Sequence, residues 1–287
     1  MLRGATGPVV MGLGTLFTGA AALAIGMPVH WVLAFCAVAS GIAFLVPPAV
    51  RRSVASLDRD LQRHRQRNEI HALLPAYRRA RLARALGPRT AMRMRLAESL
   101  LDSGEAVRAR DLLEKTTARA ADGDMPRYLP LLVRARFLAG DDAGTLKAFA
   151  ALRRHGFPLP GHVHAAAWAM LRTGRPPAEA ESLAETALAG PTPAEAAAAA
   201  LVRAEIALAR GLPDAVMVHL DACDESRLPR EARPAATLAR GQALLALGRR
   251  QEAVAVLRGV EEIGKGTRFA AEAADAIGAA GSPDSLP

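Results

Sequence analysis

Charged residues are missing from the start of the chain, where no Lys, Arg, Asp or Glu occurs between Gly4 and Val50. A stretch of that length without charge is not typical of a water-exposed domain. Cysteine is also scarce. Cys36 lies in the apolar stretch and Cys223 lies far along the chain, so the sequence offers neither a disulfide framework nor the spacing of a zinc site.

Motifs for catalysis and cofactor binding are missing as well. The chain has no glycine-rich phosphate loop ending in Lys-Ser or Lys-Thr, no His-Glu-x-x-His and no Gly-x-Ser-x-Gly. His162 and His164 are two residues apart, a poor helical spacing for two metal ligands, so we assign them a surface or capping role. An acidic group lacks the glycine spacing of a calcium loop and is interpreted as a solvated corner; it comprises Asp221, Asp224 and Glu225. We therefore expect no enzyme activity, cofactor, metal or small-molecule substrate.

Positive charge is present, but it is concentrated in one segment. The net charge of +9 and the pI of about 10.7 would by themselves suit a nucleic-acid partner. The segment from Arg51 to Arg95, however, holds thirteen arginines against three acidic residues, and from Leu96 onward the acidic residues outnumber the basic ones by two. Because the larger part of the chain is almost neutral, we exclude nucleic acid as its partner.

Two long apolar runs predict a transmembrane helical hairpin over residues 1–50. The runs, 8–27 and 29–46, each approach the roughly 20 residues that a helix needs to cross a bilayer. A break around Gly26 and Pro28 separates them and would form the tip of the hairpin. The competing interpretation is a signal peptide that is cleaved after Ala24.

The Arg-rich segment, which we define as a basic juxtamembrane linker over residues 51–88, indicates the topology. We expect Pro47 and Pro48 to end the second span, and the arginines that follow place both termini in the cytoplasm of a multi-pass inner-membrane protein. An apolar stripe of Val54, Leu57 and Leu61 could lie on the anionic lipid surface, with arginines on either side of it. These membrane-surface candidates are Arg51, Arg52, Arg59 and Arg63. Alternatively, the arginines serve only as the topology signal.

Regularly spaced glycines punctuate the rest of the chain. Their spacings are 36, 34, 37 and 37 residues, and apolar residues at helical spacing lie on both sides of each one; they are Gly104, Gly140, Gly174, Gly211 and Gly248. A period in the mid-thirties is typical of stacked helix-turn-helix repeats. In the clearest unit, residues 238–257, Gly241 leaves room for close helix contact, Gly248 turns the chain, and Leu257 packs the second helix.

This unit resembles the tetratricopeptide consensus, and the unit around Gly104 matches it nearly as well, with Ala97, Leu100, Ala109 and Leu113 at the corresponding places. The resemblance implies an all-α fold in which the transmembrane hairpin is followed by an α-solenoid over residues 89–280. We expect a helix at 69–86, a capping helix at 267–277 and a disordered tail at 281–287. The whole arrangement is similar to bacterial inner-membrane proteins that join two spans to such repeats.

Members of the tetratricopeptide family bind peptides or partner helices in the groove formed by the first helix of each pair. Counting six and three residues back from each turn glycine gives the partner-binding candidates: Glu98, Leu101, Arg134, Phe137, Trp168, Leu171, Glu205, Leu208, Gln242 and Leu245. Some members hold a C-terminal carboxylate with Asn together with Lys or Arg at these sites, whereas this sequence has Glu, Arg, Trp, Glu and Gln at the positions six residues before the glycines. Trp168 would be either an aromatic anchor in this groove or a core residue between units.

Taken together, these features predict an adaptor that holds a protein or peptide partner at the lipid bilayer without catalysis. The alternative is a structural subunit of a larger inner-membrane complex, in which the hairpin makes the main contacts. Replacing the hairpin by an unrelated anchor would separate the two hypotheses.

Overall fold

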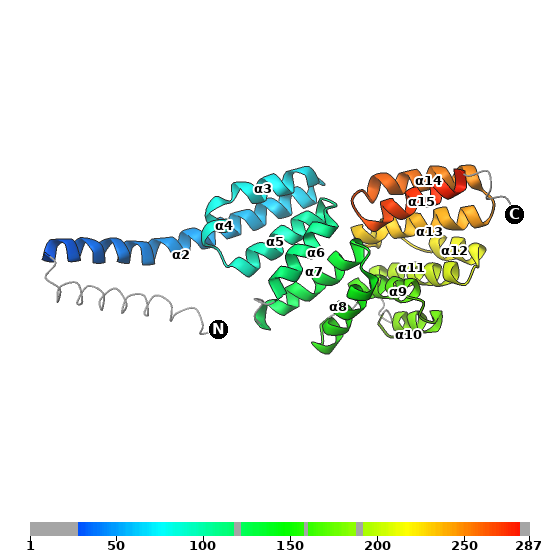
Figure 1. The fold of residues 1–287 in the computed structure, drawn as a ribbon, viewed down its shortest axis with the longest axis horizontal. Helices are drawn as coiled ribbons and strands as arrows, with labels where there is room; N and C mark the ends of the chain where they lie inside the picture. The colour runs from blue at the N-terminus through cyan, green and yellow to red at the C-terminus, as the bar shows by residue number, and fades with distance from the viewer. Residues whose placement is uncertain (1–27, 118–121, 158–159, 188–191, 282–287) are drawn as a thin grey trace. The chain divides into compact units, whose positions relative to one another are not determined.

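The computed structural model describes residues 28–117, 122–157, 160–187 and 192–281 of the 287-residue chain (Figure 1). These residues form helices joined by turns, and none of them lies in a strand, so the all-α prediction is confirmed for this part of the chain. The predicted first span, 8–27, and nearly all of the predicted tail lie outside the described residues. The chain divides into two units, Met1–Met92 and Arg93–Pro287.

A single long helix dominates the first unit. Helix α2 (Val29–Gln66) continues through Pro47 and Pro48, so the helix of the predicted second span does not stop at these prolines. Each proline removes one backbone donor, but the second half of α2 is held by Leu57 and Leu61, which are buried where α3 and α4 pack against it.

Three short helical segments follow α2: η1 (Ile70–Ala72), α3 (Leu73–Arg79) and α4 (Arg81–Leu86). The single helix predicted at 69–86 is therefore interrupted, because Ala80 leaves the helical region with a ψ of 57°. Segments this short are not stable as isolated helices, so packing on α2 rather than helix propensity decides where they break. The predicted end of this stretch at Leu86 is confirmed, with Gly87 as the residue that caps α4.

The second unit is a series of helix pairs, which lie in sequence order in Figure 1. The pairs are α5 (Arg89–Asp102) with α6 (Ala106–Thr117), α7 (Met125–Leu138) with α8 (Asp142–Arg154), α9 (Val163–Arg172) with α10 (Pro177–Ala187), α11 (Pro193–Ala209) with α12 (Pro213–Asp221), and α13 (Arg233–Ala246) with α14 (Arg250–Ile263). Helix α15 (Arg268–Gly281) follows at the predicted place of the capping helix. Short η segments precede several helices: η2 (Asp122–Asp124), η3 (Pro160–His162), η4 (Glu225–Arg227) and η5 (Arg230–Ala232).

From the second pair onward, the first helices of consecutive pairs touch one another. Helix α9 packs on both α7 and α11, α11 packs on α13, and α13 packs on α15. The second helices α8, α10, α12 and α14 each pack on the first helix of their own pair. The residues predicted for the groove all come from first helices, so this layer carries the candidate site.

The five predicted turn glycines all occupy the turns between paired helices, each with a φ between 69° and 80°. In every turn the glycine amide donates to the carbonyl three residues earlier, and the next amide donates to the carbonyl five residues earlier, as Gly174 and Arg175 do to Leu171 and Met170. This is the helix-ending motif that favours glycine, because L side chains strain a positive φ. Because the turns are alike, residues that precede their turn glycine by the same number of residues occupy equivalent positions on the first helices.

The packing predicted within the clearest unit is also confirmed. A Cβ atom added to Gly241 would lie 2.6 Å from Leu257 Cδ2, so the missing side chain is what allows α13 and α14 to approach. Ala253 and Leu257 are buried, as are the corresponding residues of the first pair, Ala109 and Leu113.

The turn before α15 meets the turn between α5 and α6. A Cβ atom on Gly266 would lie 2.1 Å from the carbonyl oxygen of Gly104, and one on Gly104 would lie 2.3 Å from the carbonyl oxygen of Lys265. Both glycines also have a positive φ. The close contact and the positive φ each disfavour a side chain at these two positions. The contact joins segments more than 150 residues apart and fixes the start of α15.

Candidate functional site

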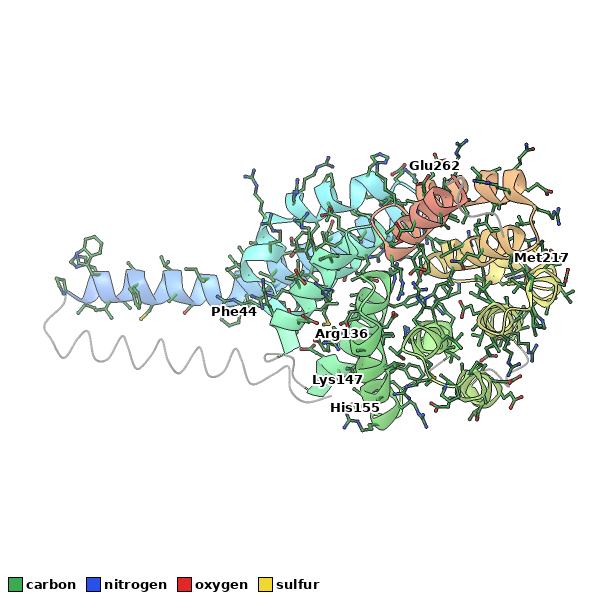
Figure 2. The ribbon with its side chains drawn as sticks, turned by 45° about the vertical axis from the view of Figure 1, so that its right-hand side comes forward. Phe44, Arg136, Lys147, His155, Met217 and Glu262 are labelled. Carbon is green, nitrogen blue, oxygen red and sulfur yellow. The ribbon has the colours of Figure 1, made fainter. Side chains whose placement is uncertain are left out.

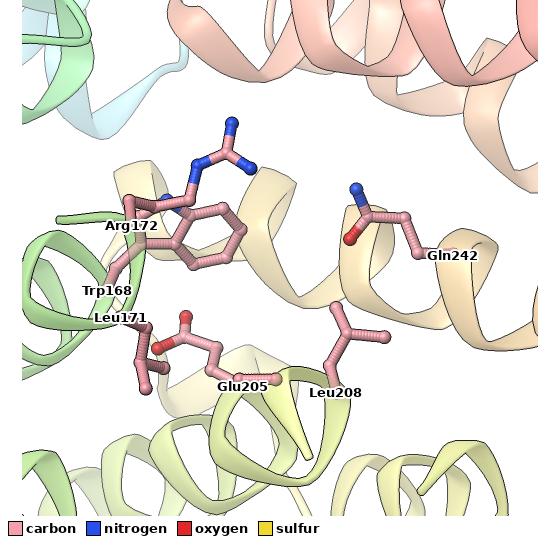
Figure 3. Close-up of a pocket in the computed structure, with 7 residues that line it drawn as sticks. Trp168, Leu171, Arg172, Glu205, Leu208 and Gln242 are labelled. Atoms are coloured by element: carbon pink, nitrogen blue, oxygen red, sulfur yellow. The ribbon is translucent and has the colours of Figure 1, made fainter. Parts of the chain in front are cut away.

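A pocket of about 340 Å³ lies among α9, α11 and α13 in the second unit. Figure 3 shows Trp168, Leu171 and Arg172 on one helix, Glu205 and Leu208 on the next, and the Gln242 amide on the far side of the open space. Ala209 completes the lining. The volume is at the lower end of the range for ligand pockets, roughly 300–1,000 Å³, and suits one or a few side chains of a partner.

Five positions predicted for the partner groove meet in this pocket: Trp168, Leu171, Glu205, Leu208 and Gln242. They converge for a geometric reason. Residues three apart share one face of a helix, and the repeated glycine turn sets that face at the same place on α9 and α11. The structure thus brings together the predicted candidates of three consecutive first helices.

Glu205 is a deeply buried polar group in the pocket, since it is only 3% exposed. Neither carboxylate oxygen accepts a hydrogen bond from any described residue. Burial raises the pKa of the Glu205 carboxyl well above its ordinary value, and the positive charge of Arg268 opposes that shift. Burying a carboxyl group without a partner is unfavourable, so this position calls for an explanation other than stability.

The two arginines near Glu205 are engaged elsewhere. Arg172 Nη2 lies 3.2 Å from Glu272 Oε1, and Arg268 Nε donates to the same oxygen at 2.9 Å. Arg268 also binds Asp142 through both terminal nitrogens, with Nη2 donating to Oδ2 at 3.1 Å. These contacts leave the Glu205 carboxyl group without a hydrogen-bond partner among the described residues.

Trp168 combines both of the roles considered from the sequence. It is 5% exposed and packs edge to face against Phe137 and Phe269, with ring centroids 6.4 and 5.6 Å away, as a core residue would. It also lines the pocket. The Arg268 guanidinium carbon lies 5.8 Å from the Trp168 ring centre and 5.7 Å from that of Phe137, within the range of cation–π attraction.

The remaining groove candidates lie away from this pocket. Leu101 and Phe137 are buried, while Glu98 and Leu245 are half-buried. Arg134 bridges two acidic groups: its Nη2 is 2.9 Å from Asp102 Oδ1 and its Nε is 3.2 Å from Glu231 Oε1. Such a committed ion pair suits a structural role in the second unit better than contact with a partner.

Sequence reasoning missed several residues of this region. Arg172 lies four residues after Trp168 and therefore on the same face of α9, a spacing that could have identified it. Phe269, Arg268 and Glu272 could not be placed in this way, because Asp142, the partner of Arg268, is 126 residues earlier in the chain.

The surface or capping role assigned to His164 is wrong. Its side chain is 3% exposed, Nε2 has no partner among the described residues, and the ring meets Phe137 edge to face at 5.4 Å. Burial lowers the pKa of His164 to about 4. His164 is at the second position of α9 on the face that packs on α7, which accounts for its burial. The described residues contain no cluster of His, Cys, Asp and Glu that could hold a metal ion.

The membrane-surface candidates of the first unit are exposed on α2: Arg51, Arg52, Arg59 and Arg63. Arg63 pairs with Asp60 at 3.2 Å. The apolar stripe beside them, however, is covered by protein, since Leu57 and Leu61 are each 2% exposed where α3 and α4 pack. Leu57 and Leu61 therefore face protein rather than lipid in this structure, while Val54 at the start of the stripe is half-buried.

Comparison with protein-family models, with curated proteins and with solved structures finds no significant match to this chain.

Proposed function

We propose that this protein is a membrane-tethered adaptor that binds a peptide segment of a partner protein in the pocket of α9, α11 and α13. The observation that carries the proposal is the convergence of five predicted groove positions on a pocket with apolar walls and a buried carboxyl group that has no hydrogen-bond partner among the described residues. Concave sites with a few placed polar groups are typical of ligand recognition.

The first half of α2 supports the tether. Among the described residues, α2 is the helix long and apolar enough to cross a membrane. Its large apolar side chains are mostly exposed, including Trp31, Leu33 and Phe44, the last of which is 73% exposed (Figure 2). A core helix of a soluble protein would bury such side chains, whereas a helix in hydrocarbon has no need to. The 18 residues from Val29 to Val46 rise about 27 Å, close to the thickness of a bilayer core.

The finer arrangement of the tether follows from the sequence. In our proposal the apolar run 8–27 and the start of α2 form a two-span hairpin, and the arginines from Arg51 onward keep both termini in the cytoplasm. The helix pairs then form a tetratricopeptide-like solenoid on the cytoplasmic side. Their repeated glycine turns and the contacts between successive first helices support that assignment.

A substitution that fills the pocket with a larger side chain tests whether the pocket binds a partner peptide. Leu208 is half-buried in the lining, so Leu208→Trp would occupy the space that a partner side chain needs. We expect full-length protein in lipid nanodiscs to enrich specific sequences from a random dodecapeptide library, and Leu208→Trp to weaken their binding about tenfold or more.

Val218→Trp provides the matched control, because Val218 is 66% exposed on α12 and does not line the pocket. This variant should bind the selected peptides as the wild type does. Failure of the wild type to enrich any peptide, or equal binding by Leu208→Trp, would contradict the proposal.

A further inference from the structure

The proposed function leaves open which chemical group a partner presents, and Glu205 narrows the choice. Its two carboxylate oxygens are both buried and both lack a partner within the described residues. Neither oxygen is exposed to solvent in this structure, so the carboxyl group turns into the pocket when a donor enters and then gains the hydrogen bonds that it lacks. A donor that carries positive charge would gain the most, because it favours the ionised form of a carboxyl group whose pKa is raised by burial, and the carboxyl proton is released to solvent as the ion pair forms.

The two unpartnered carboxylate oxygens of Glu205 favour a planar, two-pronged donor. A guanidinium group presents parallel N–H bonds that match two free carboxylate oxygens, whereas an ammonium group binds as a point charge. Trp168, Leu171 and Leu208 supply the apolar walls along which an arginine stem can pack, and Gln242 offers an amide oxygen to a remaining N–H. The lining thus suits the head and the stem of one arginine side chain.

The protein already holds a guanidinium in this manner beside the same indole. Arg268 forks onto both oxygens of Asp142, and its guanidinium lies near the rings of Phe137 and Trp168. The intramolecular site therefore combines a carboxylate with aromatic walls, as the pocket does with Glu205 and Trp168. The two sites differ in one respect: the chain itself supplies Arg268 to Asp142, whereas no described residue supplies a donor to Glu205.

Building on the proposed function, we infer that the partner segment inserts an arginine side chain into the pocket and forms a two-pronged ion pair with the buried Glu205 carboxylate. Arg172 does not take this role in the arrangement observed, where it is paired with Glu272. The selectivity of the adaptor then lies in one buried charge, while the apolar walls contribute affinity for any partner with a suitable stem.

The random dodecapeptide library on nanodisc-embedded full-length protein tests this inference. We expect the selected peptides to share one arginine, and replacement of that arginine by citrulline or lysine in a synthetic copy to weaken binding roughly 10- to 100-fold. Glu205→Gln keeps the size of the side chain and removes its charge, so the arginine peptide should bind Glu205→Gln as weakly as the citrulline copy binds the wild type.

Two further variants make the result specific. Glu262→Gln alters an exposed glutamate of α14 (Figure 2) and should retain full binding of the arginine peptide. Leu208→Arg places a guanidinium three residues after Glu205 on the same helix face, so it should fill the site from within and abolish binding while the protein melts no lower than the wild type. Normal melting of Glu205→Gln excludes unfolding as the cause of its loss.

The outcomes separate the inference from the function on which it rests. Peptides that bind without a shared arginine, or an arginine peptide that binds Glu205→Gln as tightly as the wild type, would overturn the inference and leave the adaptor standing. A wild-type protein that selects no peptide at all would overturn both.

Discussion

His164 should make the second unit sensitive to acid. The imidazole is buried at the start of α9 against Phe137, and its Nε2 has no partner among the described residues. Burial lowers the pKa of His164 to about 4 from the ordinary value of 6.5. Between these values the unfolded chain takes up a proton at this position and the folded chain does not, so acid favours unfolding.

The magnitude follows from the size of the shift. A difference of about 2.5 pKa units corresponds to roughly 3 kcal/mol at about 1.36 kcal/mol per unit. The sign is that of a group whose folded-state pKa is depressed. Its stabilisation is fully present above about pH 6.5 and is lost as the pH falls through about 4, with about 2 kcal/mol gone at about pH 5.

The assay is urea unfolding of the full chain in detergent, followed by far-ultraviolet circular dichroism at about pH 7.5 and about pH 5. His164→Phe keeps a ring against Phe137 and removes the titrating group. Between about pH 7.5 and about pH 5, the unfolding free energy of the wild type should therefore fall by about 2 kcal/mol more than that of His164→Phe. His155→Phe serves as the control, since His155 is exposed and stacked on Phe157, and it should follow the wild type (Figure 2). If His164→Phe loses stability with acid as steeply as the wild type, the reasoning is refuted.

Two further substitutions test contacts that fix α15. Gly266→Ala should lower the unfolding free energy by roughly 1–3 kcal/mol, because a Cβ atom there would clash with the Gly104 carbonyl oxygen at a residue with a positive φ. Gly278→Ala is the control, since Gly278 has open space around it and its substitution should not lower the unfolding free energy. Equal melting temperatures for Gly266→Ala and the wild type would contradict the close approach. Arg268→Lys should lower the unfolding free energy measured with urea by about 1–2 kcal/mol, since an ammonium group cannot bind both oxygens of Asp142 as the guanidinium does. Arg258 is exposed, so Arg258→Lys should leave the unfolding free energy unchanged. An unchanged urea midpoint for Arg268→Lys would show that the two-pronged contact does not stabilise the fold.

The sequence was sufficient where local physics determines the structure. A glycine is required wherever a helix ends with a positive φ, so the spacing of Gly104, Gly140 and their successors located the turns between the paired helices. Counting back along a helix then located the faces, and five of the counted residues line one pocket. Counting four residues forward from Trp168, one turn along α9, would have added Arg172.

Contacts between distant segments could not be predicted in this way. No periodicity links Arg268 to Asp142 or Gly266 to Gly104, because these contacts depend on how the whole series of pairs is packed. The burial of His164 depends on the same packing. Pro47 illustrates the opposite limitation, since a local helix-breaking signal was overridden by the burial of residues farther along α2.

The most direct test of the account joins its two halves, the tether and the pocket, in one measurement. Full-length protein in liposomes is mixed with a labelled library-selected peptide and floated through a density gradient, beside a chain whose residues 1–50 are replaced by an unrelated two-span anchor. We predict that both proteins carry the peptide to the lipid fraction. Full-length protein that stays below the lipid, or a replaced anchor that no longer carries the peptide, would contradict the account, and the latter result would favour a subunit whose contacts lie in the membrane.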